Sequence, residues 1–450
     1  MSRRVAVVGA GPAGIAAYQR LRDVGFEAHV IDPYPGGLMR TVRQGGWTIE
    51  AGAHTMATTD PAVLAMMCAI ENQLGEVSVA PAVRGRQVLL HGAPTPVPLS
   101  PGDLVASPLL SMRGRLRLLR EPFIAPQPGG DDESVDEFAQ RRFGREVAAR
   151  IIDPIVGSST GGDSRQLVAR SIFPQHVQFE RDGGSVLRGA MRAGMQARRR
   201  KGSGGKPPMS HASGIDWVVR SVTNNANGSL HHGGVTRVAL DATGVTVRWN
   251  DRDERFDKVV LAVPPSALRQ MSMEGMDRVL CATVAAMPCA SVASVSLGYR
   301  RECVARPMSS GSLLVPSSER LALLATFAAD AMFPGRAPEG HVLLTSIVGG
   351  VRHPDVFRDS EVALAQLVHA ALVGPLGLTA PPVMTHVTRW EEVMPQPVAG
   401  HHQRLAAADA LEQSAPRLAL AGGWRGGMSI GEAMASGIRA ADRLAGETAR

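Results

Sequence analysis

The chain has 450 residues, 44% of them hydrophobic and 20% charged, with 48 Lys and Arg against 41 Asp and Glu. This length excludes a single small core and predicts two or three domains, and the composition is typical of a globular protein. The formal net charge of +7 suits an anionic ligand, an acidic lipid surface or nucleic acid. The sequence contains no nucleic-acid-binding module, however, and an ordinary solvated surface explains the charge more simply.

Neither the cysteines nor the apolar runs indicate a metal site or a membrane span. No two of the four cysteines have CxxC spacing, which predicts neither a zinc site nor a thioredoxin-like motif; they are Cys68, Cys281, Cys289 and Cys303. No run of about 18 apolar residues occurs, and the chain enters a strand at once without a signal peptide. We therefore expect a cytoplasmic protein with reduced thiols.

A glycine-rich turn follows the first apolar run. Val5–Val8 predicts a buried parallel strand, and Gly9, Gly11 and Gly14 follow it in the order GxGxxG. The first glycine permits a tight turn, the second lets the backbone approach a pyrophosphate, and the third lets a helix pack close to the strand. A helix expected over about residues 13–24 directs its N-terminal N–H groups at the phosphates.

A second strand, "EAHVID", ends in Asp32, about 20 residues beyond the glycines, where a carboxylate can accept a hydrogen bond from a ribose hydroxyl. Strand, turn, helix and acid together predict a dinucleotide-binding fold; the alternative is a glycine-rich turn in an unrelated βαβ unit. Gly36 and Gly37 bring backbone near a second part of the ligand. Arg40 is placed to balance phosphate charge, unless it is an ordinary surface arginine.

The segment that follows reads as helices joined by loops. Helical sequence begins near residue 61, residues 91–111 are proline-rich and extended or turning, and Ser134 with Glu137 predicts a capping box. Helical sequence then runs to about Ile155, and residues 157–164 are expected to form a loop. Residues 198–214 are basic and rich in Gly, Pro and Ser, as in a flexible excursion.

Arginine alternates with leucine over residues 111–126. A basic amphipathic helix of this kind can rest on a membrane surface. The alternative is a helix that packs its leucines inward and leaves its arginines in water. The arginines concerned are Arg113, Arg115, Arg117 and Arg120.

The second half of the chain is rich in β signals. Residues 233–251 alternate apolar and polar positions as in a hairpin, and four later apolar runs between 290 and 350 predict a large, mostly antiparallel sheet. Helical sequence follows over 361–374. The chain ends with a strand, a glycine-rich turn and an amphipathic helix from about Ile430 to Leu444.

Several motifs resemble one family. The N-terminal turn followed by "GGLMRT" and "GWTIEAGAHTM" is similar to the flavin-containing amine oxidase superfamily, whose members wrap these pieces around an extended FAD. Within it, the chain resembles the protoporphyrinogen and coproporphyrinogen oxidases over nearly its full length. The stretches that carry this likeness are "DESVDEFAQRRFGREVAARIIDPIVGSSTGGD", "MFPGRAPEGHVLLTSIVGG", "RWEEVMPQPVAGH" and "LALAGGWRGGMSIGEAMASGIRAAD".

The resemblance implies an α/β fold with a discontinuous, Rossmann-like FAD-binding domain, an inserted mixed-sheet substrate domain and a helical subdomain. We expect residues 1–56, 210–270 and 386–450 to form the FAD-binding domain. The substrate domain would take 57–88 and 271–385, and the helical subdomain 89–205.

The resemblance also implies which residues contact FAD. Val235 would lend backbone to the adenine, Trp390 would lie near the flavin, and N–H groups at the start of the last helix would face a negative part of the flavin. Ordinary core packing is the alternative for Val235 and Trp390. The full set of expected contacts is Gly9, Gly11, Pro12, Ala13, Gly14, Asp32, Gly36, Gly37, Leu38, Arg40, Gly52, Ala53, His54, Thr55, Val235, Trp390, Gly422, Met428, Ser429 and Ile430.

Three positions depart from the family pattern. Pro35 stands where members often carry an arginine before the double glycine. His54 follows Gly52-Ala53 where many members have Gly-Pro-Asn or Gly-Pro-Arg, which makes it a candidate proton-handling group, although a lone histidine is commonly structural. Thr95 aligns with an arginine thought to hold a substrate propionate, and its loss removes a partner for a carboxylate.

The resemblance implies an FAD-dependent oxidase that passes hydride from a small molecule to flavin N5 and is reoxidised by O2, giving H2O2. A porphyrinogen is one expected substrate. An amine or alicyclic compound of secondary metabolism is the alternative, and a non-catalytic flavin carrier is the third. No metal cluster or catalytic triad is evident, and the oligomeric state is left open.

Overall fold

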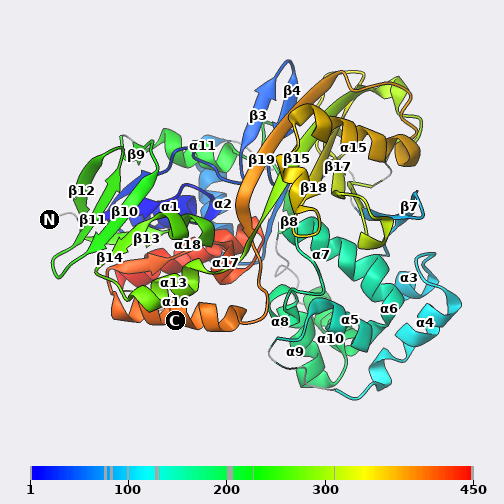
Figure 1. The fold of residues 1–450 in the computed structure, drawn as a ribbon, viewed down its shortest axis with the longest axis horizontal. Coiled ribbons are helices and arrows are strands. Elements are labelled where there is room, and N and C mark those ends of the chain that lie inside the picture. Colours follow the sequence, from blue (N-terminus) through cyan, green and yellow to red (C-terminus); the bar gives the residue numbers. More distant parts are fainter. Residues whose placement is uncertain are drawn as a thin grey trace.

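The computed structural model describes residues 3–75, 79–81, 85–98, 101–126, 130, 132–199, 206–226, 228–308 and 310–446. It confirms the expected α/β architecture: a parallel sheet with its helices, a larger mixed sheet, and a helical part below the mixed sheet (Figure 1). The glycine-rich excursion predicted over 198–214 lies partly outside the described residues.

The parallel sheet is assembled from distant segments of the chain. β1 (Arg4–Val8) pairs with β2 and β13, and all neighbours in the sheet run parallel. The strand order is β20 (Leu418–Leu420), β13 (Lys258–Leu261), β1, β2 (Glu27–Ile31) and β9 (Leu230–His231). The first apolar run is therefore a central strand, as its lack of alternation predicts, and the start, middle and end of the chain meet in one sheet.

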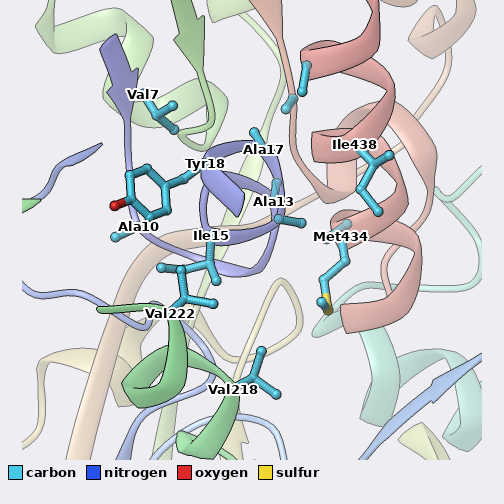
Figure 2. Packing of buried hydrophobic residues seen from close by; sticks show 14 of the residues in the cluster. Val7, Ala10, Ala13, Ile15, Ala17, Tyr18, Val218, Val222, Met434 and Ile438 are labelled. Carbon is cyan, nitrogen blue, oxygen red and sulfur yellow. The ribbon is translucent and has the colours of Figure 1, made fainter. Parts of the chain in front are cut away.

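Helices α1 (Pro12–Asp23), α11 (Trp217–Asn224) and α18 (Ile430–Ala445) share one apolar core. Figure 2 shows Ala13 and Ala17 of α1 facing Met434 and Ile438 of α18, while Ile15 lies toward Val222 of α11. A Cβ at Gly437 would lie 1.9 Å from the Ala13 carbonyl oxygen. The close approach of α1 and α18 therefore depends on glycine at that position.

A second layer covers the face of the parallel sheet opposite these helices. The hairpin predicted over 233–251 is confirmed as β10 (Val235–Leu240) and β11 (Val245–Trp249), which pair antiparallel. They belong to a four-stranded sheet with β12 (Arg252–Phe256) and β14 (Ser272–Glu274). Helices α12 (Pro265–Gln270), α13 (Arg278–Ala285) and α16 (His401–Ser414) pack nearby, and α13 contacts α16.

The mixed sheet has seven strands, antiparallel except between β16 and β6. This confirms the large, mostly antiparallel sheet expected from the apolar runs, with α15 (Glu361–Leu376) packed on it. The order is β19 (Met384–Pro395), β15 (Cys289–Arg300), β18 (His341–Gly349), β17 (Leu323–Ala328), β16 (Ser312–Leu314), β6 (Arg86–Leu90) and β7 (Ala93–Pro96). The expected domain boundaries stay a prediction. β19 lies in the mixed sheet, whereas β14 and α13 lie beside the parallel sheet.

Short elements complete these layers. They are β3 (Thr41–Gln44), β4 (Trp47–Glu50), β5 (Met56–Thr58), α2 (Pro61–Leu74), β8 (Lys206–Met209), η3 (Arg301–Cys303), η4 (Ser317–Glu319), α14 (Ala329–Met332), η5 (Pro354–Arg358) and α17 (Gly423–Gly426).

The helical part is organised around buried charge. Arg142 and Glu121 form an ion pair that is fully shielded from solvent, and the Ser134–Glu137 capping box is confirmed. The elements of the helical part are α3 (Pro101–Ala106), α4 (Met112–Leu119), η1 (Glu121–Phe123), α5 (Val135–Phe143), α6 (Arg145–Val147), η2 (Ala148–Ile152), α7 (Asp153–Thr160), α8 (Ala169–Ile172), α9 (Pro174–Gly183) and α10 (Val186–Arg199).

Two local predictions were wrong here. Residues 157–160 are helical rather than a loop, because the left-handed residue that ends α7 is Gly161 (φ 63°) and not Gly157. Residues 101–106, expected to be extended or turning, form α3 because Pro101 occupies the first helical position, where proline is tolerated.

Candidate functional site

A cavity of about 810 Å³ lies at the carboxyl edge of the parallel sheet. Gly11, Ala262 and Gly422 follow the ends of the neighbouring strands β1, β13 and β20, and all three line it. This edge is where open parallel sheets bind ligands. The lining residues are Gly11, Pro12, Ala13, Gly37, Leu38, Ala262, Val263, Pro264, Trp390, Val393, Met394, Pro395, Gly422, Gly423, Trp424, Met428, Ser429, Ile430 and Ala433.

The three glycines of the first turn have different roles. A Cβ at Gly9 (φ 98°) would lie 2.6 Å from the Ala262 oxygen, and one at Gly14 would lie 1.8 Å from the Gly9 oxygen. Both glycines are therefore required by the packing of the protein itself. A Cβ at Gly11 would meet no protein atom within 4 Å, which leaves open space beside the backbone, as a bound pyrophosphate requires.

The N-terminus of α1 faces the same cavity without a competing anion. Its N-cap residue, Gly11, makes no side-chain capping bond, and the first turn contains no acidic residue. The first N–H groups of the helix and the positive end of its dipole are thus available to a ligand phosphate. These features fit the diphosphate of FAD.

Asp32 holds the turn from the next strand. Its Oδ2 accepts a hydrogen bond from the Ala10 N–H and its Oδ1 from the Tyr34 N–H, both at 2.7 Å. Burial raises the pKa of the Asp32 carboxyl, and these two backbone bonds partly offset that rise. The carboxylate therefore fixes the loop, and its contact with a ribose stays a prediction.

The loop at Gly36–Leu38 is clamped from both sides. The Gly36 N–H donates to the Ala10 oxygen and the Ala53 N–H to the Leu38 oxygen, each at 2.9 Å. A Cβ at Gly52 would lie 2.6 Å from the Leu38 oxygen, which requires glycine there. Gly37 and Leu38 consequently reach the cavity wall beside Gly11, where a Cβ at Gly37 would lie 3.1 Å from the Gly11 Cα.

Arg40 is not an ordinary surface arginine. Its guanidinium lies 5.2 Å from the centroid of the Trp390 ring, and its Nε is buried without a hydrogen-bond partner among the described residues. Trp390 in turn donates its Nε1–H to the Ala51 oxygen at 2.7 Å and lines the cavity. An unsatisfied cationic group beside the cavity fits an anionic ligand.

Helix α18 begins at the cavity but offers fewer free backbone N–H donors to a ligand than expected. Gly422, Met428, Ser429 and Ile430 all line it, as the resemblance implies. Ser429 and Glu432 form a capping box, in which each accepts a bond from the other's backbone N–H. Two N–H groups are therefore already bonded, and the Glu432 carboxylate opposes negative charge nearby.

His54 is buried against Phe327 of β17 in the mixed sheet. Its ring stacks on Phe327 with centroids 4.4 Å apart, and its Nε2 has no partner in the described part of the chain. Burial, and then the charge of Arg336, lower the pKa of His54 to about 3. The imidazole is therefore neutral near pH 7 and does not itself line the cavity.

The other predicted contacts stand away from the cavity wall. Val235 begins β10, where it pairs with Trp249 and packs against the second core, and Thr55 is not a lining residue. Their roles stay predictions. Thr95 lies in β7, at the opposite edge of the seven-stranded sheet from β19, which forms the cavity wall.

The sequence reasoning missed two stretches of the wall. Ala262–Pro264 directly follows β13, so its position was open to inference once β13 was recognised as a neighbour of β1. Val393–Pro395 ends β19 within the family-like stretch "RWEEVMPQPVAGH", from which only Trp390 was predicted as a contact. Trp424 was also missed, although it lies between the predicted Gly422 and Met428.

Comparisons with known proteins find relatives that match nearly the whole chain. The chain is 28% identical to "Protoporphyrinogen oxidase 2, chloroplastic/mitochondrial" of Arabidopsis thaliana over 98% of its length and 93% of that protein. It is 25% identical to "Coproporphyrinogen III oxidase" of Bacillus subtilis, with 97% and 96% covered. These relatives confirm the resemblance drawn from the sequence motifs.

Solved structures show the same fold. A putative protoporphyrinogen oxidase from Exiguobacterium superposes with a TM-score of 0.82 at 19% identity, with both chains covered completely. A putrescine oxidase variant superposes with a TM-score of 0.70 at 18% identity, again over both whole chains. The family profile of flavin containing amine oxidoreductases matches residues 12–445, and the chain belongs to that family of FAD-binding enzymes.

Proposed function

We propose that this protein is an FAD-dependent oxidase acting on a porphyrinogen. The observation that carries the proposal is the near-complete coverage of proteins named protoporphyrinogen and coproporphyrinogen oxidase, which extends over the helical part and the mixed sheet as well as the cofactor segments. Likeness to the putrescine oxidase, at 18% identity, supports a shared fold only.

The residues around the cavity suit FAD in an extended pose. The diphosphate would lie against Gly11 and the start of α1, with Gly37 and Leu38 beside them, and the flavin between Trp390 and the segment that ends at Ile430. When bound, FAD supplies the hydride acceptor at N5 and passes the electrons on to O2, giving H2O2.

The chain itself contributes positioning and exclusion of water. No Asp, Glu, His, Lys or Arg is among the described residues that line the 810 Å³ cavity, and these residues contribute mostly apolar side chains and glycine backbone. This is consistent with a reaction that needs little acid–base assistance from the protein. His54, neutral because its pKa is about 3, can take part in a hydrogen bond but does not store a proton near pH 7.

The presence of Thr95 where the family has an arginine does not weigh against a porphyrinogen as the substrate. Thr95 lies in an edge hairpin, where its hydroxyl donates to the Ala93 oxygen. Five strands lie between β7 and β19, so an arginine at residue 95 would start far from the flavin cavity. The recognition of substrate carboxylates therefore has to be sought elsewhere in this chain.

Turnover under air tests the proposal. Purified protein is given coproporphyrinogen III or protoporphyrinogen IX, and the fluorescence of the porphyrin is followed together with peroxide. We expect oxidation of at least one of them at a rate well above that of protein-free solution. Oxidation of neither, with peroxide formed from an amine such as cyclohexylamine, would replace the proposal with the amine-oxidase alternative.

We also propose that the helical part rests on an anionic membrane surface through a patch on α4 and η1. We call Met112, Leu116, Leu119 and Phe123 the α4 patch; Phe123 is 82% exposed and Leu116 56%. Leu118 is buried but Leu116 and Leu119 are not, so the alternative of leucines packed inward holds for one of them only. Exposed Arg113 and Arg120 flank the patch, as an anionic lipid surface favours.

A neighbouring helix extends the patch. The Arg188 guanidinium of α10 lies 5.7 Å from the Phe123 ring centroid, and Met191 and Met195 of the same helix are exposed. Among the helices that the structure describes, none has the length and apolar character needed to cross a bilayer. The proposed contact is therefore peripheral.

A further inference from the structure

A second cavity of about 1120 Å³ adjoins the flavin cavity. The two share Pro395, Gly423, Trp424 and Met428 as walls. On its other sides the second cavity is bounded by α7, α8 and the start of α9, and by the start of α16. A molecule seated there would therefore lie directly beside the flavin cavity.

One wall carries a buried imidazole with an unused nitrogen. His401 lines this cavity and is 6% exposed, and its Nδ1 has no hydrogen-bond partner among the described residues. Burial, and then the charges of Arg404 and His402, lower the pKa of His401 to about 4. An unsatisfied buried polar atom costs free energy, and a ligand that hydrogen-bonds the imidazole would recover it.

Both positive and negative groups lie near His401. It is the first residue of α16, whose N-cap, Gly400, makes no side-chain capping bond and whose first turn lacks an acid. Arg170 of α8 lines the cavity from the facing side. The positive end of a 14-residue helix and a guanidinium therefore line one space, and the Asp132 Oδ1, which accepts a hydrogen bond from the Gly400 N–H at 3.0 Å, offsets part of that charge.

The other charged residues at the second cavity change its electrostatic potential only in part. Arg425 also lines the cavity, but Asp409 and Glu412 pair with it at 3.0 and 2.9 Å. His402 lies 3.7 Å from the Asp132 carboxylate. Glu432 is the one carboxylate among the described lining residues, and its Oε2 already accepts bonds from the Ser429 N–H and hydroxyl.

We propose that this second cavity is an anion subsite that holds a carboxylate of an organic substrate between His401 and Arg170 while the reacting carbon lies in the flavin cavity. The inference rests on the proposed function, because it assigns an acidic substrate to the same flavin. It also separates the two substrate classes: a carboxylate is attracted here and an ammonium group is repelled.

Matched neutral and charged probes test the subsite without turnover. FAD-loaded protein is titrated in a calorimeter with 3-phenylpropanoate and with 3-phenylpropanamide, which has the same shape without the charge. We expect the acid to bind about tenfold more tightly than the amide, as one charge-assisted hydrogen bond provides. Equal affinities would overturn the proposal.

Substitutions test which residues cause the tighter binding of the acid. In Arg170→Gln and His401→Phe we expect the acid to lose its advantage while the amide binds as before. Arg181→Gln, which alters an exposed arginine of α9, serves as the matched control and should keep the advantage. If His401→Phe fails to fold by circular dichroism, His401→Gln replaces it. An undiminished preference in the Arg170 and His401 variants overturns the proposal.

The outcome is separable from that of the proposed function. An acid preference that depends on Arg170 and His401, in a protein that oxidises neither porphyrinogen, would uphold the anion subsite and reject the porphyrinogen. Oxidation of a porphyrinogen by a protein without that preference would uphold the porphyrinogen and reject the anion subsite.

Discussion

Gly11 and Gly14 lie three residues apart and differ in what a methyl group would touch. At Gly11 a Cβ points into open space beside the cavity, whereas at Gly14 it would overlap the Gly9 oxygen at 1.8 Å. We therefore expect Gly11→Ala to lower the bound FAD per chain severalfold, with the melting temperature of the FAD-free protein changed by less than about 2 °C. Flavin absorbance and thermal unfolding measure the two effects.

Gly14→Ala is the matched comparison. We expect it to lower the free energy of unfolding of the FAD-free protein by about 3 kcal/mol or more, because backbone has to move. A Gly11→Ala protein with full FAD, or with the same loss of stability as Gly14→Ala, would contradict the division of roles between these glycines.

His54 predicts a pH dependence of stability. Its pKa is about 3 in the folded protein and near 6.5 in the unfolded chain. Between these values the unfolded state binds the extra proton, so the free energy of unfolding falls as the pH drops from 6.5 toward 3, by up to about 1.4 kcal/mol per pH unit. From pH 6.5 to 5 this amounts to about 2 kcal/mol.

Urea unfolding of His54→Phe at these two pH values measures the effect. Phenylalanine can keep the stacking on Phe327 but cannot bind a proton, so the variant should lose about 2 kcal/mol less than the wild type. His91→Asn, at an exposed position, should follow the wild type. Parallel losses in His54→Phe and wild type would show that His54 is solvated rather than buried.

At the scale of elements, the α4 patch makes a prediction about lipid binding. We expect the protein to float with vesicles of phosphatidylglycerol and not with phosphatidylcholine, because Arg113 and Arg120 flank the apolar side chains. Leu119→Asp with Phe123→Asp should reduce the bound fraction about tenfold or more, since each buried side chain contributes roughly 1.5–3 kcal/mol.

Val279→Asp is the control for that experiment. Val279 is also an exposed apolar side chain (74%), but it belongs to α13, in another part of the molecule. Its substitution should leave flotation unchanged. Equal losses in both variants, or equal binding to neutral and anionic vesicles, would remove the assignment of this surface.

Elements with a strong local pattern could be predicted from the sequence, and weakly patterned ones could not. The Val5–Val8 run, the Gly9–Gly14 turn and the C-terminal amphipathic stretch yielded β1, α1 and α18 because periodicity and glycine spacing are local properties. The end of α7 was misplaced because either Gly157 or Gly161 can end a helix, and only the surrounding structure selects Gly161.

At the scale of the whole molecule, the site depends on contacts between residues hundreds of positions apart. Ten of the residues expected from the family motifs do line the cavity, namely Gly11, Pro12, Ala13, Gly37, Leu38, Trp390, Gly422, Met428, Ser429 and Ile430. Ala262–Pro264 escaped prediction because its position follows from strand order, which no short motif encodes. Val393–Pro395 escaped because the stretch that contains it marks the family but not which of its side chains reach the cavity. The second cavity escaped because α8 and α16 face each other only in the folded chain.

The central claim is that the start, middle and end of this chain enclose one FAD that accepts hydride from a porphyrinogen. Anaerobic mixing of the purified yellow protein with coproporphyrinogen III or protoporphyrinogen IX tests it most directly. We predict that the visible flavin absorbance is bleached as porphyrin fluorescence rises, and that it returns when air is admitted. A colourless protein that cannot be reconstituted with FAD, or a flavin that neither porphyrinogen bleaches, would contradict the claim.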